Sequence, residues 1–148
     1  MSALAQRAWT DGHQDGSNGM RAICFVLRNR AIAGWHGGNW IALLNHAEDY
    51  AATLPCAITE IPDPNTFAFQ QVLQDADGIY NGTTADGLTQ MVGGGFVGDC
   101  RVKVPGIVPV AMYYGRLNEI NNDWFLEKIA RDPEHKRVAQ IGTLTFFS

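Results

Sequence analysis

The chain has little positive charge, few cysteines and no long apolar run, and each of these shortages excludes a class of protein. Eleven Lys and Arg residues stand against 15 Asp and Glu residues, which gives a formal net charge of -4 over 148 residues. That balance leaves no basic surface of the kind that binds nucleic acid, and no strong attraction to an anionic wall or membrane. No stretch approaches the roughly 20 apolar residues of a membrane span, so we expect no membrane-spanning helix.

The cysteine and histidine spacings also indicate no metal or redox site. Cys24, Cys56 and Cys100 form an odd, sparse set without a Cys-x-x-Cys pair, which argues against a disulfide framework or a zinc site. The four histidines lack the spacing of zinc enzymes, and the glycine run at 93–95 is not followed by the Lys-Ser/Thr of a phosphate loop. We therefore expect no metal, no cofactor, and folding in a reducing cytosol.

The order of the expected elements indicates one α+β domain over residues 1–148, mainly helical, with a small antiparallel sheet in the C-terminal half. The elements are assigned from apolar periodicity, β-propensity and turn residues. In chain order they are helices at 2–9, 17–33 and 63–80, short helical turns within 40–50, β-prone segments at 102–104 and 107–114, a short helix at 124–131, and a final strand or strand pair at 138–147 with a bend at Gly142.

A polar, glycine-rich turn near the start places two carboxylates beside an apolar helix. Asp11 and Asp15 lie in the run from Trp9 to Met20, and the helix that follows is apolar on almost every side. A carboxyl group held against apolar walls has a raised pKa and can act as the general acid that glycosidic-bond cleavage requires. The alternative is that Asp11 is an ordinary turn or cap aspartate, and that Asp15 caps the next helix, where the helix dipole favours an anion.

Four motifs, in the correct order, resemble the SleB-like cell-wall hydrolases, the family of the spore-cortex lytic enzymes. That family opens with an aromatic residue, G-E-A-R-G-E, a later glycine and a closing N-R. The run from Trp9 to Arg30 follows this register without a gap, with Asp11 and Asp15 at the two glutamate positions. The other motifs are the D-P-x-F helix and its following turn (63–86), the G-A-x-x-Y strand (110–114), and the closing segment formed by Trp124 and 141–147.

The resemblance implies a lysozyme-like fold and cleavage of peptidoglycan glycan strands by a muramidase or lytic transglycosylase. Asp11 would be the single catalytic acid and base. A chain without a visible export signal suits a phage or prophage lysis or virion enzyme. Such a protein would be made in the bacterial cytoplasm and act at the cell wall or periplasm, or as part of a phage particle.

The chain departs from the family pattern at positions that matter for chemistry. Both glutamates are shortened to aspartate, His13 replaces the arginine between them, Leu144 replaces the histidine of the closing motif, and residues near 87–107 form an inserted loop. These departures favour an alternative: a catalytically impaired protein of the same fold that binds the cell wall, serves in a virion, or self-associates through the inserted loop.

Further residues are candidates to bind sugar or to support the acid. Trp9 could form a wall of the Asp11 pocket, and His13 could orient Asp11, unless it is simply an exposed loop histidine. Aromatic faces pack on pyranose rings, although strand alternation would place one of two adjacent tyrosines in the core. The full set of supporting candidates is Trp9, His13, Asp15, Glu48, Tyr50, Tyr113 and Tyr114, with a solvated helical face as the alternative for the segment around Glu48.

Overall fold

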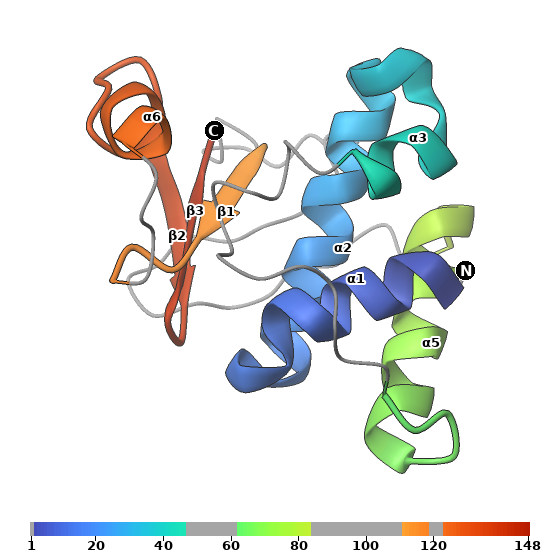
Figure 1. The fold of residues 1–148 in the computed structure, drawn as a ribbon. Helices are drawn as coiled ribbons and strands as arrows, with labels where there is room; N and C mark the ends of the chain where they lie inside the picture. The colour runs from blue at the N-terminus through green and yellow to red at the C-terminus, as the bar shows by residue number, and fades with distance from the viewer. Residues whose placement is uncertain (1, 47–61, 84–110, 119–122) are drawn as a thin grey trace.

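The computed structural model describes residues 2–46, 62–83, 111–118 and 123–148 and packs a group of helices beside a three-stranded sheet (Figure 1). The predicted α+β class is confirmed. The helical segments are α1 (Ser2–Gly12), η1 (His13–Asp15), α2 (Gly16–Ile32), η2 (Trp35–Gly38), α3 (Trp40–Asn45), α5 (Phe67–Asn81), α6 (Asp123–Phe125) and the π-helical turn η3 (Leu126–Ala130). The strands are β1 (Tyr113–Gly115), β2 (Arg137–Ile141) and β3 (Leu144–Phe147), in the antiparallel order β1-β3-β2.

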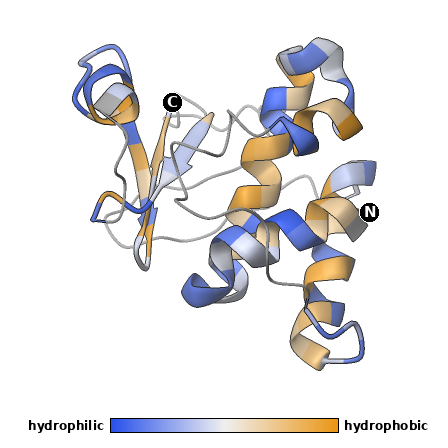
Figure 2. Ribbon diagram, viewed as in Figure 1, coloured by the Kyte–Doolittle hydropathy of each residue, from blue (hydrophilic) through white to orange (hydrophobic). Residues whose placement is uncertain are grey.

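Helix α2 is the centre of the core, as its apolar sequence predicts. Its residues from Ala22 to Leu27 are all fully buried, and Figure 2 shows the middle of this helix in the colours of hydrophobic residues. Cys24 lies within this stretch, and burial raises the pKa of its thiol to about 12. The thiol is therefore protonated and behaves as a small apolar side chain.

The sequence predicts where α5 ends but not where it begins. Gly82 adopts φ +75° just after the helix, as expected for the residue that closes it. The helix begins at Phe67 rather than at Asp63-Pro64. The Asp63 carboxylate accepts a hydrogen bond from the Asn65 amide at 2.9 Å, which forms a turn, and Thr66 caps the helix through its hydroxyl.

The C-terminal segment forms the expected strand pair. Strands β2 and β3 are joined at Gly142, whose φ of +55° is a conformation that glycine adopts without steric penalty. Strand β1 then pairs with β3, with Tyr114 opposite Phe146. The short helix expected at 124–131 is also confirmed, as α6 followed by η3. The β-prone segment at 102–104 and the first part of the segment at 107–114 lie outside the described residues.

The last turn of α2 connects the helices to the sheet. Asn29 donates to the Ala111 carbonyl oxygen at 3.3 Å, and the Arg30 Nε donates to the Met112 carbonyl oxygen at 2.8 Å. The buried Arg30 guanidinium also lies 4.7 Å from the centre of the Trp35 ring, a cation–π contact. The Asn-Arg pair therefore positions the chain as it enters β1. Across the described ranges, none of the helices combines the length and hydropathy needed to cross a bilayer.

The close approach of α2 to the preceding turn generates the first prediction. A Cβ atom on Gly19 would lie 2.8 Å from the Asp15 Cβ, and Asp15 is fixed by three polar contacts. We expect Gly19→Ala to lower the free energy of unfolding by about 1–3 kcal/mol, although alanine favours helices over glycine by about 1 kcal/mol. The exposed neighbour Asn18 provides the control: Asn18→Ala should leave stability unchanged or raise it slightly in urea denaturation. Equal effects of both changes would contradict the packing argument.

Candidate functional site

Asp11 lies in the last turn of α1 and points its carboxyl group into the protein interior. The residue is fully buried. The Tyr114 hydroxyl, from β1, donates a hydrogen bond of 2.5 Å to the Asp11 Oδ2 atom. One turn earlier on α1, the Arg7 Nη1 atom lies 3.6 Å from the Asp11 Oδ1 atom. The carboxyl group is thus held between one phenol and one guanidinium, away from water.

Burial raises the pKa of Asp11 from 3.8 to about 6. Desolvation of the carboxylate is the largest cause, and it outweighs the opposing effects of the Arg7 charge, the Tyr114 hydrogen bond and the Arg116 charge. Burial raises the pKa as expected, but the groups nearest the carboxyl are the Tyr114 hydroxyl and the Arg7 guanidinium rather than an apolar wall. The carboxyl group keeps its proton in weakly acidic solution, where an exposed aspartate would be ionised.

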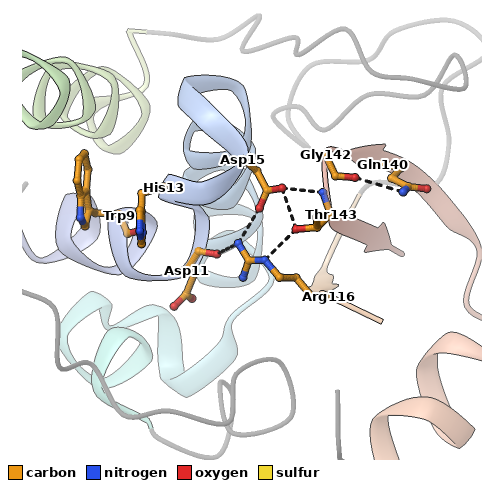
Figure 3. A network of polar contacts seen from close by, with 8 residues as sticks. All are labelled: Trp9, Asp11, His13, Asp15, Arg116, Gln140, Gly142 and Thr143. Atoms are coloured by element: carbon orange, nitrogen blue, oxygen red, sulfur yellow. Dashed lines mark hydrogen bonds and ion pairs between the residues drawn. The ribbon is translucent and has the colours of Figure 1, made fainter. Parts of the chain in front are cut away.

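Asp15 is four residues away and its side chain is also buried, but its carboxylate is paired with a cation and two further donors. Its Oδ2 atom accepts from the Arg116 Nη2 at 2.6 Å, and its Oδ1 atom accepts from the Thr143 amide at 2.6 Å and from the Thr143 hydroxyl at 2.9 Å (Figure 3). Asp15 occupies the N-cap position of α2, but its side chain makes no capping hydrogen bond. The prediction that its carboxylate caps this helix is wrong, because three donors from the sheet side hold it instead.

Arg116 joins both aspartates to the β2–β3 turn. Besides its ion pair with Asp15, its Nη2 donates to the Asp11 main-chain carbonyl oxygen at 2.7 Å, and its Nε donates to the Thr143 hydroxyl at 2.9 Å. Arg116 is itself only 2% exposed. Figure 3 shows the guanidinium between these partners, with the Asp11 carboxyl directed away from it. Arg116 therefore neutralises Asp15 and fixes the backbone, but not the carboxyl group, of Asp11.

Arg116 and Thr143 were not among the residues predicted from the sequence. Arg116 follows Tyr114 by two positions in a strand-like segment, and residues two apart in a strand share a face. That spacing was the available signal for Arg116. Thr143 carries no comparable signal, since its role comes from the β2–β3 turn meeting a side chain 128 residues earlier in the chain.

Trp9 does not form a wall of the Asp11 pocket, contrary to expectation. Residues two apart on a helix point about 200° apart, so Trp9 and Asp11 leave α1 on opposite sides. The Trp9 ring packs edge-on against Phe69 of α5 and stacks on the His13 ring, with 5.4 Å between the two ring centres. His13 is half-buried rather than exposed, and its Nδ1 lies 2.8 Å from the Trp9 carbonyl oxygen. Figure 3 shows these two rings side by side.

The two tyrosines divide as strand alternation predicts. Tyr114 is 1% exposed, so it does not line an open sugar groove and instead contacts the Asp11 carboxyl. Tyr113 is half-buried and packs against Trp35 and His135. The structure thus brings Tyr114, Asp11 and Asp15 together. The other described candidates, Tyr113, Trp9 and His13, lie elsewhere.

Some candidates cannot be placed around this site. Glu48, Tyr50 and the inserted loop near 87–107 lie outside the described residues. Within the part of the chain that the structure describes, no group of three or more His, Cys, Asp or Glu side chains is arranged to hold a metal ion. Comparison of the chain with protein-family models, with curated proteins and with solved structures finds no match.

The Arg116–Asp15 ion pair generates the second prediction. The Asp15 side chain is only 2% exposed, and replacing Arg116 by Met would leave its carboxylate without a cation. Breaking a buried pair in this way destabilises a protein by about 3–5 kcal/mol. We expect that loss in the free energy of unfolding measured with urea. The exposed Arg137 on the edge strand β2 is the matched control, and Arg137→Met should change stability by about 0.5 kcal/mol or less. Similar losses for both variants would refute a stabilising role of the Arg116–Asp15 ion pair.

The raised pKa of Asp11 generates a prediction on pH dependence. Because the folded pKa of about 6 lies above the value of 3.8 for a free aspartate, the native state binds more protons between these two pH values. The Asp11 contribution to stability therefore falls as pH rises through this window and is constant above it.

We expect the stability of the wild type, relative to the Asp11→Asn variant, to fall by about 3 kcal/mol between pH values of about 3.5 and 7. Urea denaturation of both proteins across this range measures the difference. The comparison uses the change with pH, so it is unaffected by a constant effect of the amide on stability. A difference that rises with pH would show a lowered pKa instead.

Proposed function

We propose that the protein cleaves glycosidic bonds in peptidoglycan glycan strands, with Asp11 as the general acid and base. The observation that carries the proposal is a buried carboxyl group whose pKa is raised to about 6, since a general acid must be protonated near its working pH. The ordered resemblance of four sequence motifs to SleB-like cell-wall hydrolases supports the same assignment. In this proposal, the chain is a lysozyme-like phage or prophage lysis or virion enzyme that acts at the bacterial wall.

Both oxygen atoms of the Asp11 carboxyl group face donor groups. Tyr114 donates to Oδ2, and the Arg7 guanidinium, which has no acceptor atom, lies 3.6 Å from Oδ1. These contacts favour the carboxylate, so they would stabilise the ionised form of Asp11 after it has protonated a glycosidic oxygen.

The arrangement favours a lytic transglycosylase over a hydrolase that needs two carboxylates. In a transglycosylase, one acid protonates the leaving oxygen, and the resulting carboxylate accepts the proton of the 6-hydroxyl as that oxygen closes on C1 of the same sugar. No second acid is needed, whereas most hydrolases use a second carboxyl group as base or nucleophile. Asp15 is unsuited to that second role because Arg116 and Thr143 occupy its oxygen atoms.

A second candidate function is favoured by the depth of the site. Asp11 has no exposed surface and Tyr114 has 1%, and aspartate is one methylene shorter than the glutamate of the family motif. A carboxyl group must come within about 3 Å of the oxygen that it protonates. A protein in which this approach fails would keep the fold and act as a wall-binding or virion structural protein.

Digestion of purified peptidoglycan by the wild type, Asp11→Asn and Asp11→Glu tests the proposal. We expect 1,6-anhydromuropeptides from the wild type, a loss of about 100-fold or more in Asp11→Asn because the acid is gone, and activity in Asp11→Glu. The control is Glu127→Gln, which removes an exposed carboxylate in η3 and should retain wild-type activity. Mass spectrometry of the released fragments provides the readout.

The outcomes separate the two candidates. Equal product from the wild type and Asp11→Asn would remove Asp11 from the mechanism. No product from any form, combined with cosedimentation of the wild type with intact peptidoglycan sacculi, would favour the wall-binding function. No product and no cosedimentation would reject both peptidoglycan functions.

A further inference from the structure

A hollow separate from the Asp11 site lies where the start of α3 meets the last turns of α5. Its volume is about 670 Å³, within the range of small-molecule sites in proteins. None of the residues around the Asp11 carboxyl group lines it. The described residues that line it are Asn39, Trp40, Ile41, Asp77, Tyr80 and Asn81.

Two aromatic side chains form a corner in this hollow. The Trp40 and Tyr80 ring centres are 5.2 Å apart and the ring planes meet at 66°. Trp40 is half-buried and packs against the main core, which fixes its orientation. Tyr80 is 42% exposed, although a large aromatic ring gains stability from burial. The corner thus presents rigid aromatic surface to solvent on a well-packed support.

The polar groups of the hollow supply hydrogen bonds but no positive charge. Asn39, Asp77 and Asn81 are all exposed. The Asn39 Oδ1 accepts from the Ala42 amide at 3.0 Å, so its amide group is held in place and its NH₂ is available as a donor. Among the described residues that line the hollow, there is no Lys, Arg or His. A phosphate or carboxylate ligand would find no cation among these residues and would meet the Asp77 carboxylate.

These features fit a pyranose ring. A sugar presents apolar C–H faces, which pack on aromatic rings, and hydroxyl groups, which both donate to and accept from amides and carboxylates. We propose that this hollow binds an uncharged oligosaccharide containing N-acetylglucosamine. The choice of that sugar rests on the proposed function, because peptidoglycan strands contain it. The hollow would then hold a glycan strand at a second place on the molecule, apart from the cleavage site.

Isothermal titration of the full chain with an N-acetylglucosamine tetrasaccharide tests the proposal. We expect measurable binding by the wild type and at least tenfold weaker binding by Tyr80→Ala, which removes the exposed ring and leaves the Trp40 core contact. The matched control is Phe67→Ala, which removes an aromatic ring that is 85% exposed on the same helix but outside the hollow. Phe67→Ala should bind like the wild type.

Two further arms make the result specific. A galacturonic acid tetrasaccharide should bind at least tenfold more weakly than the uncharged probe, because of repulsion by Asp77. Asp11→Asn should bind the uncharged probe as the wild type does, so a failure of catalysis and a failure of this site are distinguishable. No binding by the wild type, or equal affinities for the wild type and Tyr80→Ala, would overturn the proposal. Equal affinity for both probes would overturn its restriction to uncharged sugars.

Discussion

The rest of the structure depends on the contacts that the buried Arg116 guanidinium makes. It holds the Asp15 carboxylate, the Thr143 hydroxyl and the Asp11 carbonyl oxygen, and so ties the C-terminal sheet to the turn between α1 and α2. Desolvating an arginine and an aspartate is unfavourable unless their polar atoms are well paired. Here Asp15 meets the cation and two further donors, which satisfies that condition and fixes the β2–β3 turn against the first helices.

The same arrangement gives two nearby aspartates different chemistry. Asp15 meets a cation at 2.6 Å, whereas the Asp11 carboxyl meets a phenol and a guanidinium that is 3.6 Å away. For Asp11, desolvation outweighs these contacts and raises the pKa. The donors on Asp15 occupy both of its oxygen atoms, which is why the proposed reaction uses one carboxyl group, that of Asp11.

Local patterns predicted the parts of this fold that depend on local physics. The sequence predicted three such features: the buried, continuously apolar helix α2, the glycine that ends α5 and the bend at Gly142. Each reflects burial or backbone conformation within a few residues. The surroundings of Asp11 were predicted only in part. Asp11 and Tyr114 were among the residues singled out, but Trp9 was assigned to the wrong side of α1, and the Asp11 partners Tyr114 and Arg116 lie more than 100 residues later in the chain. Tertiary packing, which no local pattern encodes, brings them together.

Titration of the Asp11 carboxyl group tests most directly whether it retains its proton in a site shielded from water. In protein labelled with ¹³C at aspartate side chains, the carboxyl resonance that disappears in Asp11→Asn identifies the residue, and its chemical shift can be followed against pH. The structure predicts a midpoint of about 6. A midpoint at or below about 4, the value of an ordinary exposed aspartate, would contradict the account.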